Sequence, residues 1–243
     1  MLGFAVEGGT MEWFAKALGE KLYLQVFWVT FQIAAIVTIV CLLLAYPLGF
    51  LLATTTPGWA ALGFIFVLLP LWTSVLVRTY AWMVLLGRNG VLNRWLVGSG
   101  IVDDPLPLLH NLTGVLIGMV HVLLPYMVLP IYGAVKRVDP AIVAAAQGLG
   151  ASTWRIFWRI YLPLTLNGIF AGCVIVFVLS LGFYITPALL GGGRVIMIAI
   201  LIEQEVRQSL NWQFAAALSS VLLAATLAVY GLARKSMRAE PAP

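Results

Sequence analysis

The chain has 243 residues, of which 62% are hydrophobic and only 9% are charged, and its formal net charge at pH 7 is +5. Soluble globular domains carry about 25% charged residues, so this chain lacks the polar surface that a water-soluble fold requires. The composition predicts an all-α membrane protein, and the lack of a basic stripe with interleaved aromatic residues argues against nucleic-acid binding.

The first 21 residues are predicted to form an N-terminal amphipathic segment that lies along the membrane surface. Glu12 and Lys16 stand among the apolar residues Trp13 and Phe14, which is the pattern of an interfacial helix. No basic start precedes a long apolar core, so the segment does not have the pattern of a signal peptide.

Five apolar runs are long enough to cross a membrane as helices, because a spanning helix needs about 20 mostly apolar residues. These runs are Leu22–Ala53, Ala60–Leu86, Leu108–Val135, Leu162–Ile185 and Phe214–Leu232. A sixth apolar stretch, Val195–Ile202, is too short to span. We expect it to lie partly in the membrane or to pack on the bundle.

The loop between the third and fourth runs, residues 139–163, begins with signals for a short helix. Asp139 is a suitable N-cap, Pro140 suits the first helical position, and Ala141 to Gln147 are strong helix formers. The loop therefore starts with a helix of about two turns.

The second half of this loop is predicted to form another short helix. Gly148 and Gly150 permit a tight turn, Ser152 can cap a helix that ends at Arg159, and Pro163 begins the next span. Two short helices joined by a small-residue elbow make a rigid projection between two spans, which we call the knob (residues 139–159).

The same loop resembles the signature of the inner-membrane permease subunits of binding-protein-dependent ABC importers. That signature is Glu-Ala-Ala, three residues, Gly, nine residues, Ile, one residue, Leu-Pro. The positions that match it are Ala145, Ala146, Gly150, Ile160, Leu162 and Pro163. The Glu position is occupied by Ala144, a departure that removes a charged contact but keeps the shape of the knob.

The resemblance implies a type I ABC importer transmembrane domain over residues 22–235 and a cytoplasmic tail over residues 236–243. In this family the loop is a coupling helix that sits in a cleft of the ATPase subunit. The residues expected to contact the ATPase are Ala144, Ala145, Ala146, Gly150, Ala151, Ser152, Trp154, Ile160, Leu162 and Pro163.

The implied partners are a second homologous permease subunit, two ATP-binding subunits and a periplasmic solute-binding protein, all acting at the bacterial inner membrane. The chain has no Gly-x-x-x-x-Gly-Lys-Ser/Thr loop, so ATP and Mg are expected on the ATPase subunits. Cys41, Cys173, His110 and His121 lack the spacing of metal ligands. We therefore expect no catalysis by this chain itself.

The orientation of the chain in the membrane is predicted from loop 139–163, because the distribution of Lys and Arg residues decides little. A cytoplasmic C-terminus puts seven Lys and Arg residues inside and six outside, a difference of one residue. The seven are Lys136, Arg137, Arg155, Arg159, Arg234, Lys235 and Arg238. Because the coupling loop must face ATP, the resemblance puts both the loop and the C-terminus in the cytoplasm.

Two further segments resemble the spermidine/putrescine-type branch of the family. They are Val77–Trp82, which continues to Gly90, and Gly182–Pro187, which is followed by Leu190–Gly192. This resemblance implies a polyamine or a related amine or amino-acid-like solute. Members of this branch begin with one more span, so either this subunit dispenses with the leading helix or the native start lies upstream.

Six residues are candidates for the substrate path: Trp72, Arg78, Tyr80, Trp82, Phe183 and Tyr184. The aromatic rings can form cation–π contacts, although such residues more often pack helices together or lie at membrane interfaces. Arg78 either lines the path or closes a gate, or else it snorkels or bonds to carbonyls at a helix bend. No Asp or Glu lies inside a long run, so a polycation would lack a counter-charge there.

Two other classes of membrane protein, secondary transporters and embedded enzymes, require sequence features of their own. A secondary transporter driven by an ion gradient places ionisable residues and broken helices near the midplane of repeated halves, and no such repeat is evident. An embedded enzyme needs a convergent set of nucleophile, base or metal ligands, and none stands out.

Overall fold

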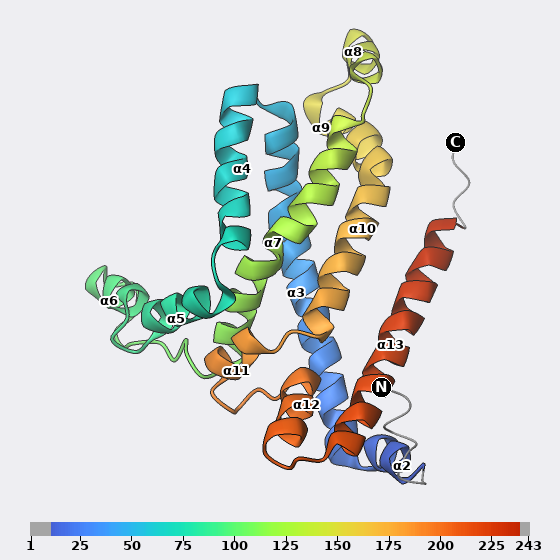
Figure 1. The fold of residues 1–243 in the computed structure, drawn as a ribbon. Coiled ribbons are helices and arrows are strands. Elements are labelled where there is room, and N and C mark those ends of the chain that lie inside the picture. Colours follow the sequence, from blue (N-terminus) through green and yellow to red (C-terminus); the bar gives the residue numbers. More distant parts are fainter. Residues whose placement is uncertain (1–10, 239–243) are drawn as a thin grey trace.

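The structure, a computed structural model, describes residues 11–238, with side chains as far as Gly231, and these residues form a bundle of helices (Figure 1). The all-α prediction is confirmed. The elements are α2 (Glu12–Gly19), α3 (Lys21–Thr54), α4 (Pro57–Trp72), α5 (Val75–Leu86), α6 (Val91–Gly98), α7 (Leu112–Lys136), α8 (Pro140–Gly148), α9 (Thr153–Ile156), the π-helical η1 (Phe157–Tyr161), α10 (Leu162–Leu181), α11 (Ile185–Gly191), α12 (Ile198–Arg207) and α13 (Trp212–Arg238).

Helices α3, α7 and α10 pack against one another and form the centre of the bundle. Their contact surfaces are apolar, with Val37 on α3, Met127 on α7 and Val176 on α10 all fully buried. Where α10 crosses α7, Gly168 and Gly172 let the two backbones approach closely. Small residues are the usual means of close helix packing inside a membrane, where no hydrophobic force drives helices together.

Four helical segments of the described chain are long and apolar enough to span a membrane. They are Lys21–Thr54, Leu112–Lys136, Thr153–Leu181 and Trp212–Gly231, which correspond to the first, third, fourth and fifth predicted runs. At 1.5 Å per residue, the 34 residues of α3 extend about 51 Å, so this helix projects beyond a hydrocarbon layer of about 30 Å.

The predicted run Ala60–Leu86 forms two helices instead of one, so the described chain has four candidate spans, or five if this bent pair counts as one. The chain breaks after Trp72, and the following pair α5–α6 bends away from α4 by 103°. The physical reason is a group of polar residues inside the run, because Thr73 and Arg78 donate side-chain hydrogen bonds to the carbonyl of Pro70. We call the bent-away segment, residues 75–98, the arm.

The prediction of a separate second short helix in loop 139–163 is wrong. Helix α9 continues through η1 into α10, so that Thr153–Leu181 forms one 29-residue helical segment. Pro163 lies in the first turn of α10. A proline has no N–H to donate to the preceding turn, and a wider π-helical turn lets the helix pass through that gap.

The short elements close the end of the bundle opposite the knob. Helix α2 packs on α13, with the Lys16 ammonium 5.0 Å from the Phe214 ring centre, and α12 packs on α13 and α3. The amphipathic prediction for the N-terminus is confirmed for α2, whereas residues 1–10 lie outside the described residues. The short stretch Val195–Ile202 leads into α12 and packs on the bundle, as expected.

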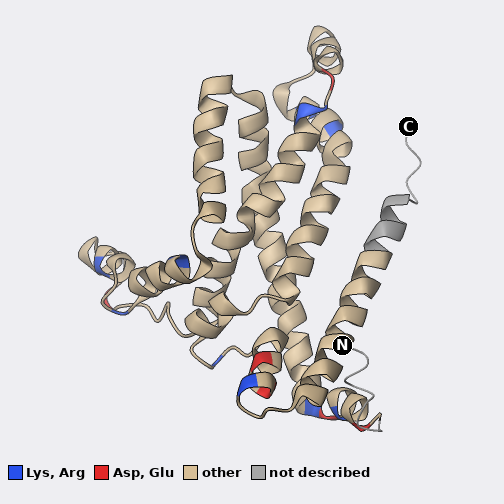
Figure 2. Ribbon diagram, in the orientation of Figure 1, with Lys and Arg blue, Asp and Glu red and all other residues tan. Residues whose placement is uncertain are grey.

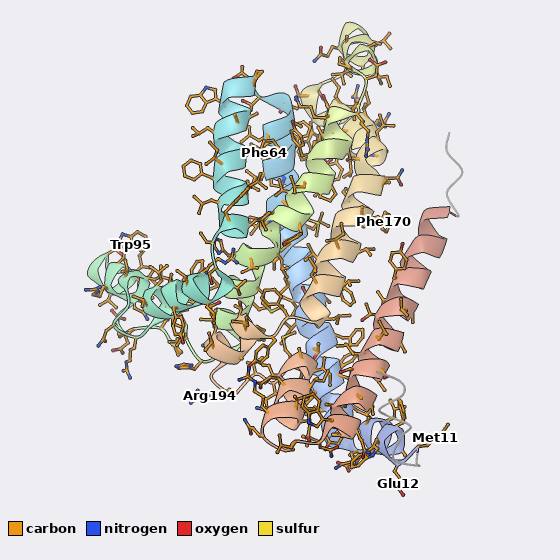
Figure 3. The ribbon with its side chains drawn as sticks, viewed as in Figure 1. Met11, Glu12, Phe64, Trp95, Phe170 and Arg194 are labelled. Carbon is orange, nitrogen blue, oxygen red and sulfur yellow. The ribbon has the colours of Figure 1, made fainter. Side chains whose placement is uncertain are left out.

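Charged residues gather at the knob, on the arm and around α2 and α12, and the long helices between them are apolar (Figure 2). Figure 3 shows apolar side chains such as Phe170 pointing outward from the middle of α10, and Trp95 standing near the tip of the arm. A layer of lipid around the middle is consistent with this distribution, because charges inside hydrocarbon are costly. Of the predicted tail, residues 236–238 continue α13, and residues 239–243 lie outside the described residues.

Candidate functional site

Helix α8 begins where the sequence predicts it. The Asp139 carboxylate accepts a hydrogen bond from the Ala141 N–H at 2.8 Å, and Pro140 occupies the first turn. None of the residues of α8 is buried. Ala144 and Ala145 are exposed and Ala146 is half-buried, so the helix presents a surface of small side chains away from the bundle.

The elbow after α8 carries the most exposed apolar side chain of the knob. Leu149 is 89% exposed, and Gly150 takes a φ of +78°, a conformation that side chains with a Cβ rarely adopt. The Ala151 N–H bonds back to the Ala146 carbonyl at 3.0 Å, and Ser152 caps α9 by accepting from the Arg155 N–H at 3.4 Å. The elbow thus holds Leu149 at its tip.

An aromatic cluster joins the knob to α3. Trp154 stacks on Phe157 with ring centres 6.0 Å apart, and Phe157 meets the edges of Tyr46 and Phe50 at 5.7 Å each. Phe50 also packs edge-on against Tyr161 at 4.9 Å. Rings fixed on three sides leave little freedom for the base of the knob to rotate independently.

Trp154 is 71% exposed although one face of its ring rests on Phe157. Beside it lies a cavity of about 360 Å³ between α3 and the knob, lined by Phe50, Val143, Gln147 and other residues. An exposed, rigidly seated tryptophan next to an apolar hollow is the kind of anchor that dominates protein interfaces. The other predicted contacts lie deeper in the segment: Ile160 and Leu162 are half-buried, and Pro163 is exposed.

Gly150 is the position where a small substitution tests the elbow. A Cβ added at Gly150 or at Gly148 meets no atom within 4 Å, but only Gly150 has a positive φ. We expect Gly150→Ala to weaken attachment of the ATPase by about 5- to 30-fold, because a left-handed alanine costs about 1–2 kcal/mol. Gly148→Ala is the matched control. Equal ATPase affinities for the two variants, measured by pull-down, would show that the elbow conformation is not used.

The six candidates for the substrate path do not form one wall. Trp72 is 88% exposed, and Tyr80 also points outward from the bundle. Trp82, Phe183 and Tyr184 are half-buried and pack against the central core. Arg78 is only 8% exposed, and its Nη1 donates to the Pro70 carbonyl. Of the alternatives that the sequence allows for Arg78, the structure thus shows bonding to a carbonyl at a helix bend.

An acidic residue that sequence reasoning missed lies beside Tyr184. Burial and the nearby carboxylate of Glu203 on α12 raise the pKa of the Tyr184 hydroxyl, and Glu203 forms an ion pair with Arg207 at 3.1 Å. Glu203 lies outside the long apolar runs, because α12 is a short helix at the opposite end from the knob. The available signal was an i, i+4 Glu–Arg pair directly after a short apolar stretch.

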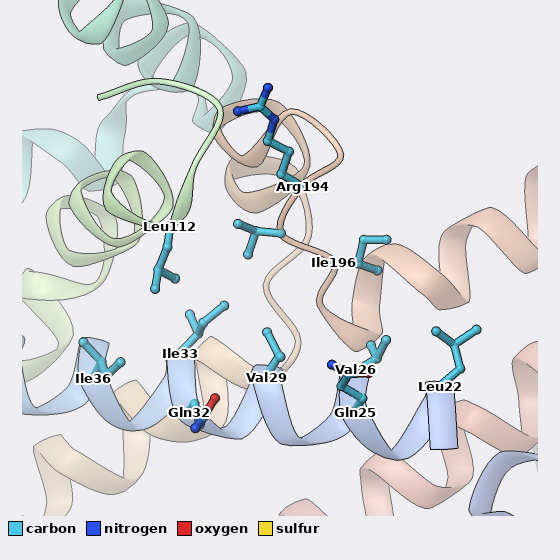
Figure 4. A pocket seen from close by; sticks show the side chains of 11 residues that line it. Leu22, Gln25, Val26, Val29, Gln32, Ile33, Ile36, Leu112, Arg194 and Ile196 are labelled. Atoms are coloured by element: carbon cyan, nitrogen blue, oxygen red, sulfur yellow. The ribbon is translucent and has the colours of Figure 1, made fainter. Parts of the chain in front are cut away.

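A groove of about 330 Å³ lies at the same end, between α3 and the segment before α12 (Figure 4). Its walls are mostly apolar, with Val29 and Ile33 on one side and Leu112 on another. Arg194 projects near its rim, and Gln25 and Gln32 add amide groups from α3. The sequence reasoning singled out none of these side chains as functional.

The sequence of the chain matches a family model and is similar to proteins of named transport systems. Residues 13–238 match the family described as "Binding-protein-dependent transport system inner membrane component". The spermidine/putrescine transport system permease protein PotB of Haemophilus influenzae is 40% identical over 221 residues, which cover 90% of this chain and 77% of that protein. PotB of Escherichia coli K12 is 34% identical over 203 residues, covering 84% and 74% respectively.

The fold is also similar to a solved structure. A bacterial alginate ABC transporter in complex with an alginate pentasaccharide-bound periplasmic protein includes a chain that superposes with a TM-score of 0.78. The sequences are 18% identical, and the match covers 96% of this chain and 85% of that one. At this identity the similarity establishes the fold alone.

Proposed function

Since the chain belongs to the family of inner-membrane components of binding-protein-dependent transport systems, we propose that it forms half of the translocation path for a polyamine in an ATP-driven importer. A second related permease forms the other half, two separate subunits bind ATP and Mg and hydrolyse the ATP, and a periplasmic protein delivers the solute. The chain acts as a transport subunit of the bacterial inner membrane.

The observation that carries this proposal is the construction of the knob. The knob exposes Leu149 at its tip and Trp154 at its base. Trp154 belongs to the 29-residue helical segment Thr153–Leu181, so the base of the knob and the spanning helix are one piece. A force applied to the knob therefore moves a whole spanning helix as a rigid body, which is a means of alternating access between the two sides. The spanning helix ends at Leu181, and Tyr184 follows three residues later, close to Glu203.

The proposed orientation puts the knob and the C-terminus in the cytoplasm. Helix α13 starts beside α2 and α12 and runs back toward the knob end (Figure 1). The opposite end, which carries α2 and α12, then faces the periplasmic binding protein.

Two observations support a cationic solute, in addition to the names of the relatives. Arg78 is buried against a backbone carbonyl, so its charge is not presented to a path surface. Glu203 supplies a carboxylate close to Tyr184, and a carboxylate with an aromatic ring attracts an ammonium group. Arg78 therefore does not repel a cation in the path, and Glu203, which also pairs with Arg207, is a carboxylate outside the long runs.

The proposal is tested in proteoliposomes that contain both permeases and the ATPase, supplied with the binding protein and radiolabelled spermidine. We expect uptake only when ATP is enclosed with the ATPase subunits. Uptake driven by a proton gradient without ATP would contradict the proposal and favour a secondary transporter.

Replacing Glu203 with Gln tests the polyamine assignment within this assay. The change keeps the shape of the side chain but removes its charge, and we expect spermidine uptake to fall about 3- to 10-fold, as for loss of one partly screened charge contact. Glu12→Gln, on exposed α2 at the same end, is the control. Wild-type spermidine uptake by the Glu203 variant would argue against a carboxylate in the path.

A further inference from the structure

One face of α5 carries polar side chains that fasten the arm to three other helices. Arg78, Thr79 and Trp82 lie on this face and are buried or half-buried, whereas Leu76, Val77 and Val84 are exposed. Residues separated by three or four positions share a helix face, so the three polar side chains point to the same side.

The contact with α4 is made by Arg78. Helix α4 ends at Trp72, which leaves the carbonyls of its last turn without backbone donors. Arg78 Nη1 donates to the Pro70 carbonyl, and Thr73 Oγ1 donates to the same oxygen at 3.1 Å. A cation at the C-terminal end of a helix is also favoured by the helix dipole.

Arg78 is not saturated by these contacts. Its Nε is buried and has no hydrogen-bond partner among the residues that the structure describes. A guanidinium has five N–H donors in a fixed plane, so it can exchange one carbonyl of an open helix end for another without losing its anchorage.

The other two contacts reach the core and the helix that follows α10. Thr79 Oγ1 lies 3.2 Å from Thr186 Oγ1 on α11, and Trp82 Nε1 donates to His121 Nδ1 on α7 at 3.1 Å. Helix α11 follows α10 after the short connection 182–184, so the arm contacts both α4 and the helix that comes directly after α10.

We propose that Arg78 is a positioning residue of the transport cycle: it locks α5 onto the open end of α4, so that the arm and α4 move together when α10 moves. The link to transport rests on the proposed function, whereas the lock itself is a statement about geometry. Arg78 acts through α4 and α5 and does not contact the solute.

The lock is tested by measuring the distance between spin labels on the two helices. Labels at Leu62→Cys on α4 and Val84→Cys on α5 both occupy exposed positions. We expect a narrow distance distribution in the otherwise native chain and a clearly broader one when Arg78→Met is added. Arg94→Met removes an exposed charge from the same arm and is expected to leave the distribution narrow.

Transport by the same variants gives a second readout. Arg78→Met is expected to lower the maximal uptake rate about tenfold, with the KM for the solute changed less than twofold, because coupling rather than binding is lost. Arg78→Lys keeps the charge but not the fork of donors, and we expect intermediate values of both the distribution width and the rate.

A narrow distribution together with wild-type uptake for Arg78→Met would overturn the proposal, as would a change confined to KM. If Arg78→Met does not accumulate in the membrane, Arg78→Lys decides, and a narrow distribution with full uptake in that variant contradicts the lock. If the wild-type complex transports no polyamine, the proposed function fails, and the spin-label distances still test the lock.

Discussion

Replacing Trp154 with alanine is expected to weaken attachment of the ATPase subunit by about 30-fold or more, as the loss of an interface anchor costs 2 kcal/mol or more. The indole is 71% exposed, yet its orientation is fixed by stacking on Phe157, which is itself held by Tyr46 and Phe50. An anchor that is already ordered loses little side-chain entropy on binding, so most of its buried area contributes to affinity.

The measurement is the retention of the ATPase on the purified permease, followed as a function of ATPase concentration. Trp59→Ala is a matched control, because Trp59 is 69% exposed and lies near the start of α4, at the same end of the bundle but outside the knob. We expect the control to bind the ATPase normally. Equal losses in the two variants would mean that any exposed tryptophan at this end contributes, and that the knob has no special role.

A bulky residue at Gly168 is expected to separate the two central helices and to destabilise the fold by about 3 kcal/mol or more, because an overpacked core must shift its backbone. A Cβ at this position would lie 2.5 Å from the Ala134 Cβ and 2.8 Å from the Pro130 carbonyl oxygen on α7. Neither atom can turn away, since one is a backbone atom and the other is attached directly to the backbone.

The check compares Gly168→Leu with Gly133→Leu in thermal unfolding of the detergent-solubilised chain. Gly133 lies on α7, where an added Cβ meets no atom within 4 Å, so leucine is tolerated there within this chain. We expect a lower melting temperature or a lower yield for the Gly168 variant alone. A Gly168 variant that melts with the unchanged protein would refute the close α7–α10 packing.

Hydropathy predicted α3, α7 and α13 because each is a long apolar stretch bounded by turn-forming residues. It missed the break after Trp72, because the apolar count of the run Ala60–Leu86 hides a few polar side chains. Thr73, Ser74 and Arg78 were the available signal. Whether such residues break a helix depends on a tertiary hydrogen bond, here the one from Arg78 to Pro70, which no sequence window contains.

The first half of the knob was predictable for a local reason. The N-cap at Asp139 and the glycine elbow are determined within a few residues, and both are found. The continuation of α9 into α10 was missed, since Pro163 usually marks a helix start and the π-helical turn that admits it is rare. The exposure of Leu149 and the nearness of Glu203 to Tyr184 result from tertiary packing, and no local pattern reports them.

The account is tested most directly by photo-crosslinking from the knob to the ATPase. A benzophenone attached at Ser152→Cys, which is exposed in the elbow, should give an adduct with the ATPase subunit that mass spectrometry identifies. The same probe at Ser209→Cys, which is exposed at the opposite end, should give none. An ATPase adduct from Ser209 and none from Ser152, in a complex that retains the ATPase, would contradict both the proposed orientation and the coupling role of the knob.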